Sequence, residues 1–76
     1  MPPRNNPPVG ATWKGINEYG YGATIWLKER NGNSEYWSWS ANYPDGSIPG
    51  HWRGWDTSYR GCKINLPIIC KMKRIK

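Results

Sequence analysis

The sequence predicts an all-β fold, in the form of a small antiparallel sheet of short hairpins with long loops. Nine glycines and seven prolines in 76 residues interrupt the chain too often for a long amphipathic helix. The segments between these residues are rich in β-branched and aromatic side chains, which is typical of strands. We therefore expect short strands within residues 9–15, 22–30, 34–41 and 66–73, and a loop at residues 15–22.

The clearest local pattern is a hairpin centred on Asn31 and Gly32, because an Asn-Gly pair between two aromatic, β-branched segments is a strong turn signal. A two-residue turn at these positions fixes which residues face each other across the two strands. The resulting register contains an aromatic pair and a pair of opposite charges, each of which stabilises a sheet by a few tenths to about 1 kcal/mol. These pairs are Trp26 with Trp37 and Lys28 with Glu35.

The same register divides the hairpin into two faces, since successive side chains of a strand point to opposite sides of the sheet. One face carries Ile25 and Leu27, which are suited to inward packing. The other face carries three tryptophans, Trp26, Trp37 and Trp39. Large aromatic side chains are usually well buried, so this second face is either another buried layer or an exposed platform. The sequence leaves both alternatives open.

The two cysteines, Cys62 and Cys70, predict a disulfide. A domain this small usually needs a cross-link, a metal or a partner chain. A metal site is disfavoured because the chain has one histidine, His51, and no Cys-x-x-Cys pair. The bond would close a second hairpin with its turn at residues 65–67, and would stabilise the fold by about 2–3 kcal/mol. A disulfide implies an extracytoplasmic setting, and two free cytosolic thiols are the alternative.

Four prolines in the first ten residues predict an extended linker over residues 1–10, followed by a single small β domain over residues 11–76. Because a proline-rich spacer joins two folded parts, we expect this domain to be the C-terminal module of a longer chain. The sequence has no apolar segment approaching the roughly 20 residues of a membrane-spanning helix, and its start lacks the hydrophobic segment of a signal peptide. We therefore expect no membrane insertion.

The chain is strongly basic, with 11 lysines and arginines against 5 acidic residues and a net charge of +6. Such a balance favours anionic partners, which include nucleic acids, membrane surfaces and phosphorylated or acidic glycans. Four of the positive charges lie in the last six residues, "KMKRIK". A charged tail of this kind is either a binding element or a solubilising chain end.

The residues that enzymes need are scarce. The single histidine has no partnered serine or cysteine nucleophile, so no catalytic triad can be assembled. The sequence also lacks a glycine-rich phosphate loop and any metal-ligand spacing. We therefore expect a non-catalytic protein with no cofactor and no metal.

The segment from residue 34 to residue 62 instead has the composition of a binding surface, with four tryptophans and three tyrosines. These side chains offer a flat apolar face and one polar group, which suits the C–H patches and hydroxyls of sugars. Residues 42–61 form a turn-rich loop in which charged and amide groups lie between the aromatics. The candidate ligand-binding residues are Trp52, Trp55, Arg53, Asp56, Tyr59, His51, Trp37 and Trp39.

Within this set the sequence favours the loop pair, Trp52 and Trp55, over the hairpin pair, because its neighbours offer the hydrogen bonds that a sugar needs. The alternative is that both loop tryptophans fold back and cap a small core.

The segments "IWLKERNGNSEYWSW" and "GWDTSYRGCKINLPIICK" resemble the second half of a C-type lectin-like domain. That family has a "WIGL"-type strand, an E-x-W-x-W strand, a tryptophan-containing strand, and two cysteines ending in "ICE" or "ICK". The resemblance covers roughly residues 25–71 and implies a lectin-like module. It does not imply calcium binding, because no Glu-Pro-Asn motif is present and Trp55-Asp56-Thr57 replaces Trp-Asn-Asp too far from Cys62. The N-terminal half of the family, with the cysteines that pair with these two, is also absent, so a Cys62–Cys70 bond would itself be a departure.

The layout of the chain is similar to a second group of proteins. A Pro/Gly-rich lead-in, a tryptophan-rich module and a basic C-terminus resemble the interchangeable C-terminal segments of bacterial pilus-tip adhesins and the ends of phage tail fibres. This resemblance implies recognition of cell-surface polysaccharide, often lipopolysaccharide, whose phosphates would suit the positive charge.

Together these features predict a non-catalytic, lectin-like adhesin or receptor-binding module at the cell surface or outside the cell. Its partner would be an anionic cell-surface glycan such as lipopolysaccharide, with no nucleic acid. The alternative is a domain that binds single-stranded nucleic acid by stacking bases on aromatic side chains beside basic ones. A cationic membrane-active peptide is a third possibility, disfavoured because no segment has one clearly apolar side.

Overall fold

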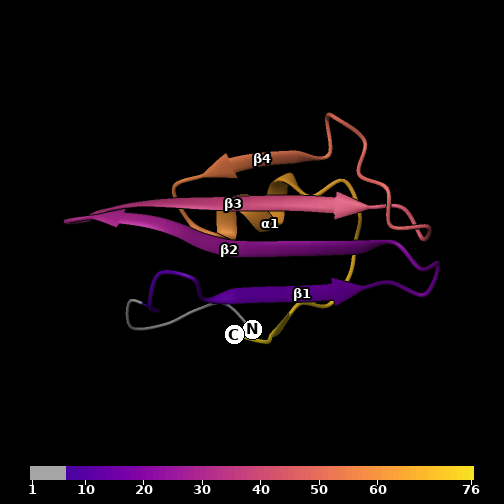
Figure 1. The fold of residues 1–76 in the computed structure, drawn as a ribbon, viewed down its shortest axis with the longest axis horizontal. Coiled ribbons are helices and arrows are strands. Elements are labelled where there is room, and N and C mark those ends of the chain that lie inside the picture. The colour runs from indigo at the N-terminus through magenta and orange to yellow at the C-terminus, as the bar shows by residue number, and fades with distance from the viewer. Residues whose placement is uncertain (1–6) are drawn as a thin grey trace.

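A five-stranded antiparallel sheet organises the structure, a computed structural model that describes residues 7–76. The strands lie in the order β4-β3-β2-β1-β5, and one short helix, α1, completes the fold (Figure 1). The all-β antiparallel fold expected from the sequence is therefore confirmed. In chain order the elements are β1 Thr12–Ile16, β2 Gly22–Asn31, β3 Ser34–Asn42, β4 Arg53–Asp56, α1 Tyr59–Asn65 and β5 Lys73–Arg74.

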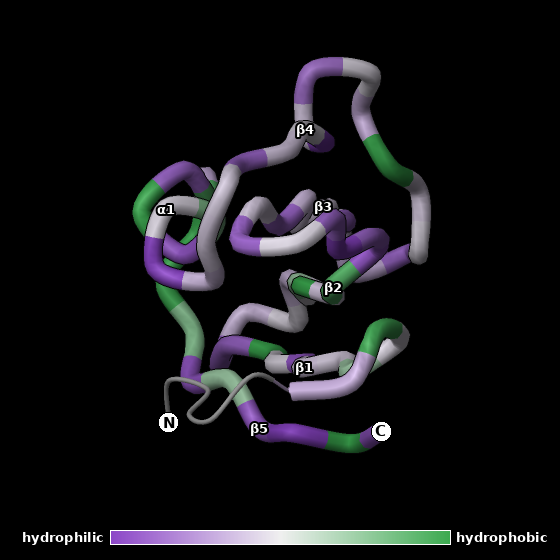
Figure 2. The backbone as a smooth tube through the Cα atoms, turned by 90° about the vertical axis from the view of Figure 1, so that its left-hand side faces the viewer, coloured by the Kyte–Doolittle hydropathy of each residue, from purple (hydrophilic) through white to green (hydrophobic). Residues whose placement is uncertain are grey.

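The helix covers one face of the sheet, and among residues 7–76 no helix covers the other face. Figure 2, which looks along the strands, shows α1 to one side of β2, β3 and β4, and α1 contacts all three. In the described part of the chain α1 is the one α-helix, and no helix there is long and apolar enough to cross a membrane. The side of the sheet away from α1 is called the open face below.

The first three strands were predicted at the right places, and the later ones were not. β1, β2 and β3 fall where the β-rich segments are, and residues 17–21 form the loop expected between the first two. β4 lies inside the segment predicted to be a loop, and it pairs along the edge of β3. The strand expected over residues 66–73 is wrong, since only Lys73–Arg74 pairs, with β1.

The second hairpin predicted around the cysteines is also wrong, because α1 takes its place. Ser58 caps the helix, its hydroxyl accepting a hydrogen bond from the Gly61 amide at 3.0 Å. The helix ends where the Leu66 amide donates to the Lys63 carbonyl, directly before Pro67, which cannot donate. A serine cap and a proline stop are helix signals that outweigh the β-branched composition of this segment.

The turn of the first hairpin is shifted from its predicted position. Asn31 pairs with Ser34, so Gly32 and Asn33 form the turn, and Gly32 has the positive φ of 57° that glycine tolerates. A bulge at Lys28 then shifts the register again.

Beyond the bulge, Leu27 faces Trp37 and Ile25 faces Trp39, while Trp26 faces Ser38. The predicted Trp26–Trp37 pair and the face of three tryptophans are therefore wrong. A register change of one residue turns every side chain of a strand to the other face. Trp37 and Trp39 thus join Ile25 and Leu27 beneath α1, and Trp26 lies on the open face.

The core lies between the sheet and α1 and is built mainly from aromatic rings. The Trp13 ring lies 5.7 Å from that of Trp37 and 5.1 Å from that of Tyr59, measured between centroids. Trp37 is 1% exposed. The remaining buried members of this cluster are Ala11, Ala23, Ile25, Leu27, Trp39, Cys62 and Met72. Tryptophan thus does the packing for which most proteins also use phenylalanine, which this chain lacks.

Glu35 accepts the hydrogen bond of a tryptophan in this core, Trp37. Its carboxylate accepts hydrogen bonds from Nε1 of Trp37 at 3.0 Å and from Nη2 of Arg30 at 2.7 Å. These two hydrogen bonds hold the pKa of Glu35 below its ordinary value. The predicted Lys28–Glu35 pair is wrong, since the shifted turn places Arg30 opposite Glu35.

The folded unit begins before the predicted boundary at residue 11. Pro7 is buried, and its carbonyl accepts a hydrogen bond from Nη2 of Arg30 at 2.6 Å. The Gly10 amide donates to the Leu27 carbonyl at 2.8 Å. Residues 7–10 therefore belong to the domain, and residues 1–6 of the predicted linker lie outside the described residues.

Cys62 and Cys70 are both free thiols, so the predicted disulfide is not formed. Cys62 belongs to α1 and is fully buried in the core, and burial raises the pKa of its thiol to about 12. Cys70 lies beside β1, where its Sγ is 3.0 Å from the position that a Cβ on Gly15 would occupy. The prediction failed because α1 carries Cys62 into the core, away from the hairpin geometry on which the bond depended.

The packing predicts that truncating two aliphatic side chains, one buried and one exposed, changes the free energy of unfolding by very different amounts. Leu27→Ala should lower the free energy of unfolding by about 2–5 kcal/mol, because Leu27 is 0% exposed and its loss leaves a cavity. Ile69→Ala should change it by less than about 0.5 kcal/mol, because Ile69 is 93% exposed. Urea denaturation of both variants measures the difference, and equal losses would contradict this assignment of the core.

The hydrogen bonds of Glu35 predict how the free energy of unfolding depends on pH. Because the folded-state pKa of Glu35 is lowered, its stabilisation is fully present above its ordinary pKa of 4.5 and is lost as the pH falls through the lowered value. Glu35→Gln should therefore cost up to about 1 kcal/mol at pH 7, with the difference from wild type shrinking below pH 4.5. Urea denaturation from pH 2 to pH 7 tests this, and Glu29→Gln controls for the loss of one charge on the hairpin.

The thiols predict a labelling pattern. In native protein, iodoacetamide should modify Cys70 well before Cys62, because Cys62 is 0% exposed and Cys70 is only half-buried, while burial raises the pKa of both thiols. In urea without a reductant, both cysteines should be modified, as counted by mass spectrometry. A protein that takes no label in urea until it is reduced would instead contain the disulfide.

Candidate functional site

The open face gathers the side chains that alternate away from α1 on the three strands at one edge of the sheet. Register places Trp26 opposite Ser38, and Ser38 opposite Trp55, so the three lie in one line across β2, β3 and β4. One step along, Ser40 lies opposite Arg53. Because cross-strand partners share a face, these groups form one surface.

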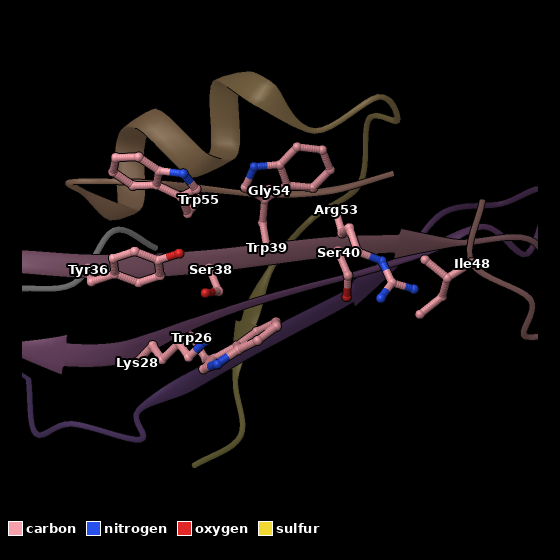
Figure 3. A pocket seen from close by; sticks show the side chains of 10 residues that line it. All are labelled: Trp26, Lys28, Tyr36, Ser38, Trp39, Ser40, Ile48, Arg53, Gly54 and Trp55. Carbon is pink, nitrogen blue, oxygen red and sulfur yellow. The ribbon is translucent and has the colours of Figure 1, made fainter. Parts of the chain in front are cut away.

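A shallow depression of about 440 Å³ occupies this surface. Figure 3 shows its side chains converging from β2, β3 and β4, with Ile48 reaching in from the loop before β4. Its walls are formed by Trp26, Lys28, Tyr36, Ser38, Trp39, Ser40, Ile48, Arg53, Gly54 and Trp55.

Tyr36 and Trp55 provide the aromatic part of the depression. Their rings are nearly parallel, with 10° between the planes and 5.1 Å between the centroids. Trp55 is 57% exposed, and the ammonium of Lys28 lies 5.5 Å from the centre of the Tyr36 ring. Figure 3 shows the two rings adjacent at one end of the depression, with Trp26 across from them. This pair, with Trp26, is called the aromatic platform.

Gly54 allows a fourth aromatic side chain to reach the site. Trp39 belongs to the core face and is 8% exposed, yet it borders the depression. A Cβ at position 54 would lie 2.8 Å from Nε1 of Trp39, which is too close for any side chain there. The glycine therefore makes room for the indole at the edge of the sheet.

The structure separates the predicted loop pair. Trp55 is part of the aromatic platform, and Arg53 lines the same depression. Trp52 instead packs in a second cluster, its ring centroid 4.9 Å from that of Tyr43 and 6.1 Å from that of Tyr21. His51 is exposed next to Trp52, with 6.2 Å between the ring centroids.

Four other predicted site residues lie away from the open face. Trp37 and Tyr59 are buried in the core, and Trp39 reaches the depression only past Gly54. Asp56 points to the α1 side, where its carboxylate accepts hydrogen bonds from the Thr57 amide at 2.6 Å and from Nδ2 of Asn65 at 3.3 Å. These residues serve packing and local structure in this fold.

Sequence reasoning missed seven of the ten residues that line the depression, namely Trp26, Lys28, Tyr36, Ser38, Ser40, Ile48 and Gly54. The alternation of β3 contained the signal, since Tyr36, Ser38 and Ser40 are every second residue and necessarily share a face. Which face they share depended on the bulge at Lys28, and no residue pattern marks that bulge.

The depression offers three kinds of group that can contact a ligand. It offers flat aromatic surface, serine hydroxyls that both donate and accept hydrogen bonds, and the cations of Lys28 and Arg53. Among residues 7–76 there is no group of three or more His, Cys, Asp or Glu side chains placed to hold a metal ion.

Comparison of the chain with protein-family models, curated protein sequences and solved structures finds no match in any of the three. The resemblance to C-type lectin-like domains therefore stays a prediction from the sequence.

Proposed function

We propose that this chain is a non-catalytic glycan-binding module that uses the open face of its sheet. The observation that carries the proposal is the aromatic platform, in which Tyr36 and an exposed Trp55 lie parallel beside Ser38. Trp26 borders the same depression from the far side of Ser38.

Each component of the platform matches one part of a sugar. A pyranose presents an apolar patch of C–H groups on its ring face, and an indole or phenol ring contacts such a patch at little entropic cost. Its hydroxyls need partners when they leave water, and Ser38, Ser40, Lys28 and Arg53 surround the rings. The depression is open and shallow, which suits one stretch of a longer polysaccharide.

The second candidate function is the binding of single-stranded nucleic acid, which is favoured by the net charge of +6 and by the cations on the open face. We favour a sugar because Tyr36 already carries a stacked indole and a cation near its ring. Stacking covers one face of each ring, so the exposed Trp55 offers one free face, which serves a single sugar ring, whereas successive bases need several free ring faces.

The setting of this function is part of the same proposal. The layout resemblance to pilus-tip and tail-fibre segments supports display outside the cell, on a longer chain, with a surface polysaccharide such as lipopolysaccharide as ligand. The proposal rests on the platform and does not need a disulfide.

A pair of tryptophan variants tests the site. Trp55→Ala should weaken the binding of a glycan ligand at least tenfold, because it removes the exposed half of the parallel pair. Trp52→Ala removes a half-buried tryptophan from the other aromatic cluster and should change the affinity by less than twofold. A glycan array identifies the ligand, and isothermal titration calorimetry compares the variants after circular dichroism has confirmed their folding.

Two outcomes would overturn the proposal. One is binding to oligodeoxynucleotides with a steep loss of affinity in salt and no binding to any bacterial surface glycan. The other is a loss of glycan binding in Trp52→Ala with none in Trp55→Ala, which would move the site to the loop.

A further inference from the structure

A line of polar and basic side chains crosses all five strands of the open face. Starting from β4, each residue is the register partner of the next one, on the neighbouring strand. We call this line the basic row, and its members are Arg53, Ser40, Thr24, Lys14 and Lys73. Figure 2 shows β4 and β5 at opposite edges of the sheet, so the row runs from one edge to the other.

The basic row lies beside a parallel aromatic row. That second row consists of Trp55, Ser38, Trp26 and Thr12, again one residue from each of four neighbouring strands. The two rows are two residues apart along every strand, which is about 7 Å. With strands about 4.8 Å apart, the two tryptophans are about 10 Å from each other and the basic row is about 19 Å long.

Lys14 and Lys73 are the unexpected members of the row. They lie directly opposite each other on β1 and β5, and both are exposed. Like charges in directly opposite positions destabilise a sheet, so folding alone does not account for this pair. An anion bound between the two ammonium groups would offset their repulsion.

The carboxylates of the chain leave the basic row without a counter-charge. Glu35 is held by Arg30, Asp45 lies in the loop after β3, and Asp56 lies on the α1 side. Glu18 lies in the loop between β1 and β2, and Glu29 is opposite Tyr36, towards the hairpin turn. The three cations of the row therefore face solvent without an acidic neighbour in the row.

We propose that the ligand is a polyanionic glycan that lies across the strands. Its sugar rings contact the aromatic row, and its phosphate or carboxylate groups contact the basic row. Lys14 and Lys73, which lie outside the depression around the platform, select the charged form of the glycan. This inference rests on the proposed function, because it specifies the ligand and the orientation of the same site.

The test pairs two charge-neutralising variants with two forms of one ligand. K14Q/K73Q removes the facing lysines, and K63Q/K71Q removes two exposed lysines near the C-terminal end of the chain, off the open face. The ligands are lipopolysaccharide and the same material after dephosphorylation, measured by calorimetry at low and high salt.

Wild type and K63Q/K71Q should bind the phosphorylated form at least tenfold more tightly than the dephosphorylated form at low salt. K14Q/K73Q should lose most of this preference, because its affinity should fall much more for the phosphorylated form than for the dephosphorylated form. Its affinity should also depend less on salt, because surface charge contacts are screened.

The possible failures are distinguishable from one another. If K14Q/K73Q and K63Q/K71Q prefer the phosphorylated ligand equally, the proposed role of the basic row is wrong. If Trp55→Ala still weakens the binding of both ligands in that case, the proposed function stands. If neither form binds, the proposed function itself fails. If single-stranded DNA displaces the glycan and binds more tightly at every salt concentration, the occupant is a nucleic acid and both proposals are wrong.

Discussion

The pairing of Leu27 with Trp37 and of Ile25 with Trp39 is the constraint on which the rest of the structure depends. It brings two large indoles and two aliphatic side chains to one face of the central hairpin, where α1 and Trp13 cover them. The bulge at Lys28 sets this pairing. It adds one residue to β2, so the register of the core pairs differs by one residue from the register at the hairpin turn.

The same constraint creates the candidate site on the other face. Once Trp37 and Trp39 turn inward, Tyr36, Ser38 and Ser40 must turn outward. β4 then adds along β3 and brings Trp55 and Arg53 into line with them. The core and the aromatic platform are thus two consequences of one register, and within residues 7–76 no helix covers the platform, whose Trp55 is 57% exposed.

A core made of tryptophan and tyrosine buries polar groups that need hydrogen-bond partners, and the structure gives partners to only some of them. Nε1 of Trp37 donates to Glu35, so the buried indole is satisfied. The Tyr59 hydroxyl is buried and finds no hydrogen-bond partner among the residues that the structure describes. An unpaired hydroxyl of this kind costs about 1–3 kcal/mol, and burial raises the pKa of Tyr59. Ring packing against Trp13 and Trp37 offsets this cost.

The sequence by itself determined the all-β antiparallel fold, the places of β1, β2 and β3, and a polar, aromatic and basic composition suited to binding. Alternation and turn residues are local signals, so these features could be read from short segments. Only the tertiary structure decided which tryptophans face the core and which face solvent, and that Lys14 and Lys73 pair. Each of these depends on a bulge or on a pairing between distant segments, where packing of the whole sheet outweighs local preference.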